Sequence, residues 1–307
     1  MWRIFTQALA RRQFRVKPAS KLAAIVVPLS LRTELSPDEE ISLRHLRHFF
    51  AGYDKYGIAP AGLQVLVPDL KIRYFPRKFF GSAVAHNRLT YSPLFYRAFS
   101  DYKFILFYHL DSLAFSDQLP YWCNRDLDYI GAPWLQCPDT PWVDRPRVGN
   151  GGFALLRVEA ALNVLANRYK LEPVRYWLDL IDRNARLFQP VVRLLRKTKH
   201  CLPKSDVVGR LRNEWSRIEK PTEHGLNNDL FWSDEAVRYF PGFKVASLEE
   251  GVRFAFEAAP RTCYEMNGHE LPFGCHAWAR FDRSFWEPHL LKSEATKSEY
   301  STHALCR

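Results

Sequence analysis

The chain has 307 residues, of which 47% are hydrophobic and 25% are charged, and this composition excludes a disordered, collagen-like or low-complexity protein. It has no GxGxxG fingerprint of a dinucleotide-binding fold and no apolar run near the roughly 20 residues of a membrane span. The formal net charge is +11, and most of that excess lies in one segment.

The first predicted element is a strand over Ala23–Leu29, which is apolar on both faces as in a buried parallel sheet. A helix follows, with Ser36 as its N-cap and Pro37 in its first turn, and it runs to about Tyr53. A second strand is expected at Leu63–Val67. This order predicts a β-α-β unit of the doubly wound type.

The middle of the chain continues the alternation of helices and strands. A helix with an early proline is predicted over Ser92–Phe99, and Tyr102–His109 is the most strand-like run in the sequence. A short strand over Tyr129–Trp134 follows. Gly149–Phe153 forms a tight turn that leads through a further strand into a helix over about Val158–Ala166.

The basic excess is concentrated between Arg168 and Lys220, a segment with 14 Lys and Arg and 6 Asp and Glu and therefore a net charge of +8. Apolar residues recur there at a spacing of three to four, which predicts a helical insertion with basic faces. Such a surface suits nucleotide phosphate, an acidic glycan or glycolipid, a membrane surface or nucleic acid. A solvated helical face without a partner is an equal alternative.

The last third is predicted to hold an ordered piece at Asn227–Trp232, a strand at Phe243–Ala246, a helix at Leu248–Ala258 and a loop at Gly274–Trp278. No internal repeat or linker divides the chain. We expect an α/β fold, a mostly parallel sheet flanked by helices, over residues 21–290 with a basic helical insertion at 168–220. A basic N-terminal segment, 1–20, and a C-terminal tail, 291–307, flank it.

The six cysteines include no CxxC pair and match no zinc module. In a chain of this length they indicate reduced thiols, and the basic start of the sequence lacks the apolar stretch of a signal peptide. We therefore expect a cytoplasmic protein, with peripheral contact at the inner face of the membrane as a variant of that prediction.

Two short motifs could carry chemistry at the ends of strands. Asp111, in His109-Leu110-Asp111, follows the strongest strand and could hold a cation or a sugar hydroxyl, or serve as a turn residue. The run Gly149-Asn150-Gly151-Gly152 allows positive φ and close backbone approach to a ligand, or forms a plain turn.

Two later motifs add an acid and a histidine. Asp229, among Asn227 and Asn228, could act as a general base for a hydroxyl, or could cap a helix. His276 lies between Cys275 and Ala277 and could ligate a metal or contact a phosphate, or could be a hydrogen-bonded structural residue.

Several blocks occur in the order of a known family: LDYIGAPW, VGNGGF, NNDLFWS, FKVASLEEGVRFAFE and LPFGCHAW, preceded by EISLRHL and HNRLTYSPLFYRAF. Over about Ala23 to Pro288 the chain resembles a bacterial family catalogued as a domain of unknown function, which looks like the GT-A nucleotide-sugar glycosyltransferases. The resemblance implies a GT-A-like, Rossmann-like fold.

The resemblance also implies roles for residues that would bind the donor. Val27–Thr33, with Arg32 as a ligand, would line the nucleotide pocket, and Arg88 would face the donor phosphates or sugar. Asp111 stands where GT-A enzymes have the last Asp of the DxD metal motif, while His109 takes the place of the first Asp. This departure leaves one carboxylate where the motif has two.

Further residues would complete the site. His276 would join Asp111 as a metal ligand, and Asn150, Gly151 and Gly152 would sit under the sugars. Asp229 would be the catalytic base of an inverting enzyme.

The function implied is sugar transfer from a nucleotide-sugar, expected to be a UDP-sugar, to an acceptor hydroxyl in glycan or polysaccharide synthesis, with Mn²⁺ or Mg²⁺ as cofactor. The acceptor would be a glycan or glycolipid. The alternatives are transfer to a modified base of nucleic acid, a sugar- or nucleotide-binding relative without catalysis, and an interaction protein that uses the helical insertion.

Overall fold

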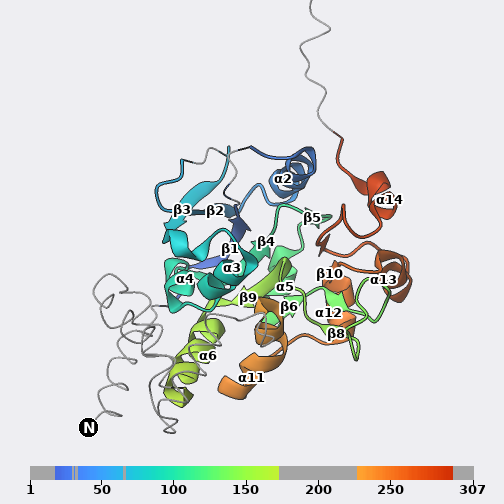
Figure 1. The fold of residues 1–307 in the computed structure, drawn as a ribbon. Coiled ribbons are helices and arrows are strands. Elements are labelled where there is room, and N and C mark those ends of the chain that lie inside the picture. The colour runs from blue at the N-terminus through green and yellow to red at the C-terminus, as the bar shows by residue number, and fades with distance from the viewer. Residues whose placement is uncertain (1–17, 30, 32–33, 65–66, 173–226, 293–307) are drawn as a thin grey trace, which may run out of the picture.

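The computed structural model describes residues 18–29, 31, 34–64, 67–172 and 227–292 (Figure 1). Several predictions fall outside these residues: most of the basic N-terminal segment and of the C-terminal tail, Arg32, and the helical insertion beyond Glu172. Among the helices of the described part, none combines the length and the apolar character that crossing a bilayer requires.

The centre of the fold is a six-stranded sheet in the order β3-β2-β1-β4-β9-β6. Strands β3, β2, β1 and β4 are parallel to one another, and β9 is antiparallel to both β4 and β6. The predicted mixed α/β fold with a mostly parallel sheet flanked by helices is therefore confirmed. The strands are β1 Lys21–Pro28, β2 Asp54–Pro60, β3 Lys71–Phe75, β4 Tyr102–Tyr108, β6 Tyr129–Gly131 and β9 Phe153–Arg157.

The chain enters the sheet through the predicted β-α-β unit. Helix α2 (Pro37–Phe49) connects β1 to β2, and its capping box joins Ser36 to Glu39. The predicted second strand at Leu63–Val67 is wrong, because β2 lies earlier. The sequence of β2 contains Gly57 and a proline, two residue types of low strand propensity, so it does not have the pattern of a strand. Close packing requires the glycine, because a Cβ at Gly57 would lie 2.6 Å from Leu29 Cδ1.

Helices α3 (Ala83–Thr90) and α4 (Pro93–Ala98) precede β4, and α6 (Val158–Leu171) follows β9. The predictions for α4, β4, β6 and the start of α6 are confirmed, whereas α3 was not predicted. Two short elements, the 3-10 turn η1 (Arg77–Phe79) and α5 (Leu119–Cys123), complete this half.

The C-terminal part is built from short elements (Figure 1). The predicted helix at Leu248–Ala258 ends at Phe254. The next residue begins β10, which pairs with β11, and β11 pairs with β5 to complete a second, three-stranded sheet. Phe243–Ala246 is not a strand, since only Val245 bridges to Tyr129. The elements are α10 Asn228–Leu230, the π-helix η4 Phe231–Glu235, α11 Ala236–Tyr239, α12 Leu248–Phe254, β10 Ala255–Phe256, α13 Pro260–Met266, β11 Gly274–Cys275, α14 Arg283–Trp286, η5 Glu287–His289 and β5 Leu113–Ala114.

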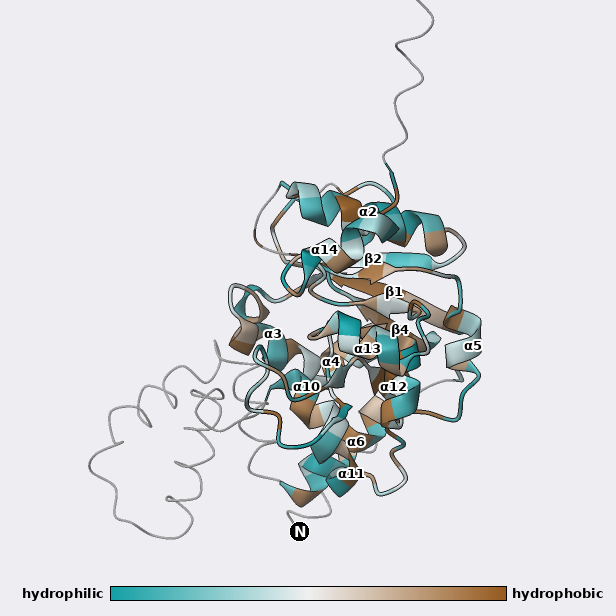
Figure 2. Cartoon of the chain, turned by 90° about the vertical axis from the view of Figure 1, so that its right-hand side faces the viewer, coloured by the Kyte–Doolittle hydropathy of each residue, from teal (hydrophilic) through white to brown (hydrophobic). Residues whose placement is uncertain are grey.

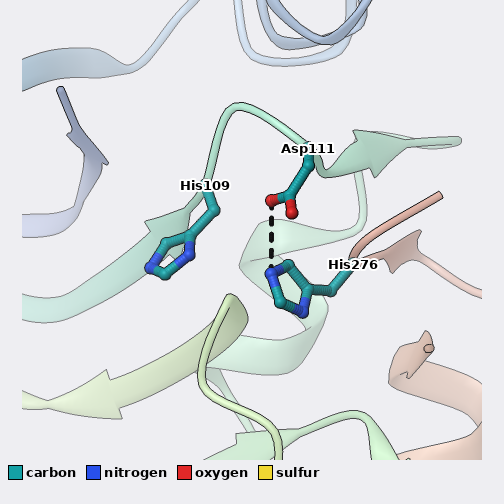
Figure 3. Close-up of side chains that lie close together, drawn as sticks. All are labelled: His109, Asp111 and His276. Atoms are coloured by element: carbon teal, nitrogen blue, oxygen red, sulfur yellow. Dashed lines mark ion pairs between the residues drawn. The ribbon is translucent and has the colours of Figure 1, made fainter. Parts of the chain in front are cut away.

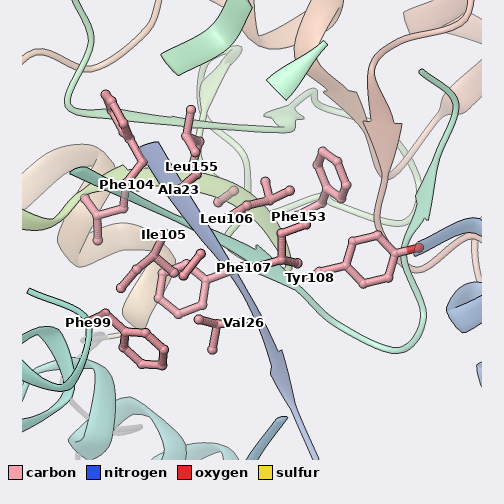
Figure 4. Close-up of a cluster of buried hydrophobic side chains, with 14 of the residues drawn as sticks. Ala23, Val26, Phe99, Phe104, Ile105, Leu106, Phe107, Tyr108, Phe153 and Leu155 are labelled. Carbon is pink, nitrogen blue, oxygen red and sulfur yellow. The ribbon is translucent and has the colours of Figure 1, made fainter. Parts of the chain in front are cut away.

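The core lies on both faces of the sheet. Successive residues of β4 point to opposite faces, yet all from Phe104 to Tyr108 are buried, packing with Val26 of β1 and Leu155 of β9 (Figure 4). Apolar strands run through the interior, and hydrophilic surface lies on covering helices such as α2 (Figure 2). Burial on both sides leaves only the strand ends for polar chemistry.

One long excursion leaves the sheet after β6 and returns at the carboxyl end of β4. Residues 132–152 connect β6 to β9, and we call them the hairpin excursion; they contain the two-stranded hairpin of β7 (Pro133–Trp134) and β8 (Arg147–Val148). The backbone N–H groups of Gly149 and Asn150 both donate to the Ala132 carbonyl and close its base. Because Tyr108 pairs with Phe153, the excursion returns beside the end of β4.

Candidate active site

The two predicted metal ligands, Asp111 and His276, meet at the carboxyl end of β4, and His109 joins them there. His109 and Asp111 follow this strand, His276 follows β11, and their ligand atoms lie within 4.8 Å of one another (Figure 3). His276 Nε2 is 3.2 Å from Asp111 Oδ1. The sequence interpretation treated His109 only as a departure from the DxD motif; the turn after β4, closed by the Ser112 N–H donating to the His109 carbonyl at 2.9 Å, brings its ring into the group.

Backbone hydrogen bonds hold the two loops of this trio together. The His109 N–H donates to the Gly152 carbonyl at 2.9 Å, and the Trp278 N–H donates to the Asp111 carbonyl at 3.1 Å. The His276 N–H donates to the Phe256 carbonyl at 2.9 Å. The relative position of the three side chains is therefore set by main-chain contacts between distant segments.

A buried carboxylate that the sequence interpretation missed orients His276. Glu257 is 8% exposed, and its Oε1 lies 2.9 Å from His276 Nδ1. The Asn150 side-chain amide donates to the same oxygen at 2.6 Å, and Asn150 Oδ1 accepts from the Gly152 N–H. With one ring nitrogen held in this way, the other is directed at Asp111, as in the outer shell of many histidine metal sites.

The glycine turn serves close approach rather than unusual backbone angles. A Cβ built at Gly151 would lie 2.4 Å from Asp229 Oδ1, and one at Gly152 would lie 2.1 Å from His276 Nε2. The expectation of positive φ is wrong, because none of the glycines at 149, 151 and 152 adopts it. Consecutive glycines thus leave room for the two site residues, which brings Asp229 into the same site as His276.

Asp229 has the electrostatics of a proton acceptor. Burial and the charge of Glu257 raise its pKa to about 7, while the His276 charge and hydrogen bonds from Gly151 and Asn228 oppose that shift. The N-cap of α10 is Asn227, so Asp229 is not the capping residue. A carboxylate that titrates near neutrality is suited to accept a proton at physiological pH.

The histidines differ in charge. Burial lowers the pKa of His109 to about 3, which keeps its ring neutral and able to donate a lone pair. Burial also opposes charge on His276, but the ion pairs with Asp111 and Glu257 outweigh it and raise its pKa to about 10. The same contact with His276 holds the pKa of Asp111 well below its usual range despite the opposing effect of burial.

The donor set fits a divalent cation. Two imidazole nitrogens and one carboxylate oxygen are close enough to share an ion, which would take the place of the proton on His276 Nε2. The Asp111 side chain is 53% exposed, so the group can be reached from solvent. Mg²⁺ prefers oxygen ligands, whereas imidazole suits transition metals. Of the two cations predicted, Mn²⁺ therefore matches these ligands better.

The other predicted ligands stand as follows. Arg88 is half-buried on α3, two residues after His86, whose ring lies edge-on to His109 at 5.8 Å between centroids. Its contact with donor phosphates stays a prediction, and so does a contact of Asn150 with a sugar. Arg32 lies outside the described residues.

Comparison with known proteins gives a family and one solved structure. A galactosyltransferase, LgtC, solved in complex with donor and acceptor sugar analogues, is similar over 82% of this chain and 86% of its own, at 11% identity and a TM-score of 0.41. No curated protein matches the sequence. The family described as "Protein of unknown function (DUF5672)" matches residues 69–276, more than half of the chain. This match confirms the resemblance to a family of unknown function, and the chain belongs to DUF5672.

Proposed function

We propose that this protein is a glycosyltransferase that moves a sugar from a nucleotide-sugar donor to an acceptor hydroxyl. One observation carries the proposal: Asp229, with a pKa of about 7, adjoins a trio of potential metal ligands at the carboxyl end of β4. Ligands of open α/β sheets bind beyond the carboxyl ends of the strands. The motif order of the sequence, which resembles the GT-A enzymes, supports the same reading.

The site residues would divide the chemistry between them. His109, Asp111 and His276 would hold a divalent cation, whose contribution is positive charge opposite the departing diphosphate. Asp229 takes the proton of the acceptor hydroxyl. At the same time the hydroxyl oxygen bonds to the anomeric carbon of the donor sugar, and the bond from that carbon to the diphosphate breaks. Attack from the face opposite the diphosphate gives inversion. Glu257 keeps the His276 ring aimed at Asp111 throughout.

The finer parts of the proposal concern substrates and organisation. The donor is a UDP-sugar, Arg88 contacts its phosphates, and the acceptor is a glycan or glycolipid. Residues 21–290 form the catalytic domain, and the basic insertion at 168–220 faces an anionic acceptor or a membrane surface from the cytoplasmic side. The net charge of +11 and its concentration in that insertion support these assignments.

The test measures binding and donor cleavage separately. Nucleoside diphosphates and UDP-sugars are screened with and without Mn²⁺ by thermal unfolding, since a ligand that binds the native state raises the Tm. Release of UDP is then followed for wild type, Asp229→Asn and the control Asp126→Asn, an exposed acid in the loop before β6 that pairs with Lys244. We expect loss of release in the first variant alone. A flat thermal panel, or wild-type turnover in Asp229→Asn, would contradict the proposal.

One observation favours a second candidate, a donor-binding protein without catalysis. His109 replaces the first carboxylate of the DxD motif and leaves Asp111 as the acidic ligand of the trio. Fewer negative ligands hold a cation less tightly. Under this alternative a UDP-sugar raises the Tm of the wild type, yet no UDP is released at any Mn²⁺ concentration.

A further inference from the structure

The hairpin excursion, residues 132–152, exposes a large aromatic ring. Trp142 is 56% exposed, whereas the other tryptophans in the described part of the chain are buried. Its ring is nevertheless held in place, because it packs edge-on against the buried Trp134 with 5.0 Å between ring centroids. An exposed indole with a fixed orientation is a surface on which a flat ligand can lie.

The excursion starts and ends at the candidate site. Its closing residues Asn150, Gly151 and Gly152 are the ones that contact Glu257, Asp229 and His276. The Trp134 ring also fills the space beside Gly149, where an added Cβ would come within 2.1 Å of it. Packing is thus continuous from Trp142 through Trp134 to the glycine turn.

Two further contacts anchor the excursion on either side of the site. Cys137 packs against a small cluster of Ala258, Ala277 and Phe281, and its two alanines directly follow Glu257 and His276. Arg147 Nε lies 3.3 Å from Asp234 Oδ2, on the π-helix that follows the segment of Asp229. The loop that carries Trp142 is therefore attached to each of the chain segments that supply the site.

We propose that Trp142 is the platform of the acceptor subsite, on which a neutral pyranose ring of the acceptor stacks; this rests on the proposed function. One face of a pyranose presents C–H groups and packs flat on an indole ring, while its hydroxyls need polar partners at the edge. Asp144 and Arg145, both exposed, follow Trp142 by two and three residues and supply such groups. The donor diphosphate, being anionic, belongs instead at the cation trio.

The experiment compares Trp142→Ala with Trp142→Phe and with a matched control, Tyr121→Ala. Tyr121 is 49% exposed and packs edge-on against the buried Trp122, also at 5.0 Å, but on α5, outside the excursion. Saturation-transfer NMR with para-nitrophenyl pyranosides measures acceptor binding without donor, and transfer from UDP-sugars with Mn²⁺ measures KM. We expect Trp142→Ala to weaken glycoside binding about threefold to tenfold.

The same variant should leave the donor KM and the release of UDP by water unchanged, Trp142→Phe should restore most of the binding, and Tyr121→Ala should behave as wild type. The proposal that Trp142 is the acceptor platform is wrong if Trp142→Ala binds glycosides as wild type does, or if no glycoside binds wild type. It is also wrong if Trp142→Ala raises the donor KM and leaves acceptor binding unchanged. These results are separate from the proposed function, which fails when wild type releases no UDP even though glycosides bind.

Discussion

Replacing Gly152 by alanine tests whether the glycine turn positions His276. The added Cβ would lie 2.1 Å from His276 Nε2, 2.2 Å from Cδ2 and 2.5 Å from Cε1. Non-bonded carbon atoms normally stay about 3.5 Å apart, so the ring has to move by roughly 1 Å. The ring is held by Glu257 at 2.9 Å and Asp111 at 3.2 Å, and both contacts change when it moves.

Two magnitudes follow from this geometry. Inserting a methyl group into a packed site costs about 1–3 kcal/mol of unfolding free energy. Disturbing the support of a metal-ligating histidine costs about tenfold to a hundredfold in metal affinity. We expect Gly152→Ala to show both effects, measured by chemical denaturation and by Mn²⁺ titration calorimetry. Gly52→Ala is the control, because a Cβ at Gly52 meets no atom within 4 Å.

A double-mutant cycle then separates the clash from other effects of the substitution. In a His276→Ala background the added methyl group has no ring to displace, so the stability cost of Gly152→Ala should largely disappear. If Gly152→Ala alone binds Mn²⁺ with wild-type affinity and unchanged stability, the reasoning about close approach is refuted. An equal cost in both backgrounds would place the strain elsewhere than at His276.

Three other predictions concern the same site. Glu257→Gln should weaken Mn²⁺ binding about tenfold to a hundredfold by calorimetry while the fold is retained, with Glu257→Asp intermediate; equal affinities would exclude a role in orienting His276. His109→Ala should abolish Mn²⁺ binding as measured by electron paramagnetic resonance, whereas His86→Ala should not, and the reverse result would reassign the ligand. The pKa of Asp229 is raised from 3.8 to about 7, so the folded chain binds a proton that the unfolded chain releases, and stability falls as the pH rises from about 4 to 7. Asp229→Asn should therefore stabilise the protein at pH 8, by at most about 4 kcal/mol, and should not stabilise it at pH 4. Calorimetry at the two pH values measures this difference, and equal stabilisation at both would count against a raised pKa of Asp229.

Local signals made part of the fold predictable. Strand β1 and strand β4 are long apolar runs, and α2 has a capping box that can be read at Ser36. Strand β2 could not be recognised in this way, because it contains Gly57, a residue that is unfavourable in strands. The glycine is needed there because Leu29 and Ile72 leave no room for a side chain. That constraint comes from two neighbouring strands and is invisible in the segment itself.

The candidate site was predictable to a similar degree. Asp111, Asp229 and His276 stand out because polar residues interrupt apolar runs or lie in the motif blocks, and the structure brings them together. Glu257 was missed because the sequence around it resembles the end of a helix, whereas pairing with β11 turns Ala255–Phe256 into a strand. Its partners Asn150 and His276 are 107 and 19 residues away, and no local pattern encodes such contacts.

The reversed direction of β9 has a consequence for how this protein can vary. Because β9 runs against β4, its first residue rather than its last lies at the carboxyl edge, and the chain can re-enter the sheet there through a tight glycine turn. Length changes in the distal loop at 135–146 would leave that re-entry point in place. A single insertion between Gly149 and Gly152 would displace the backbone that packs against both Asp229 and His276. Changes in specificity should therefore be confined to the distal loop.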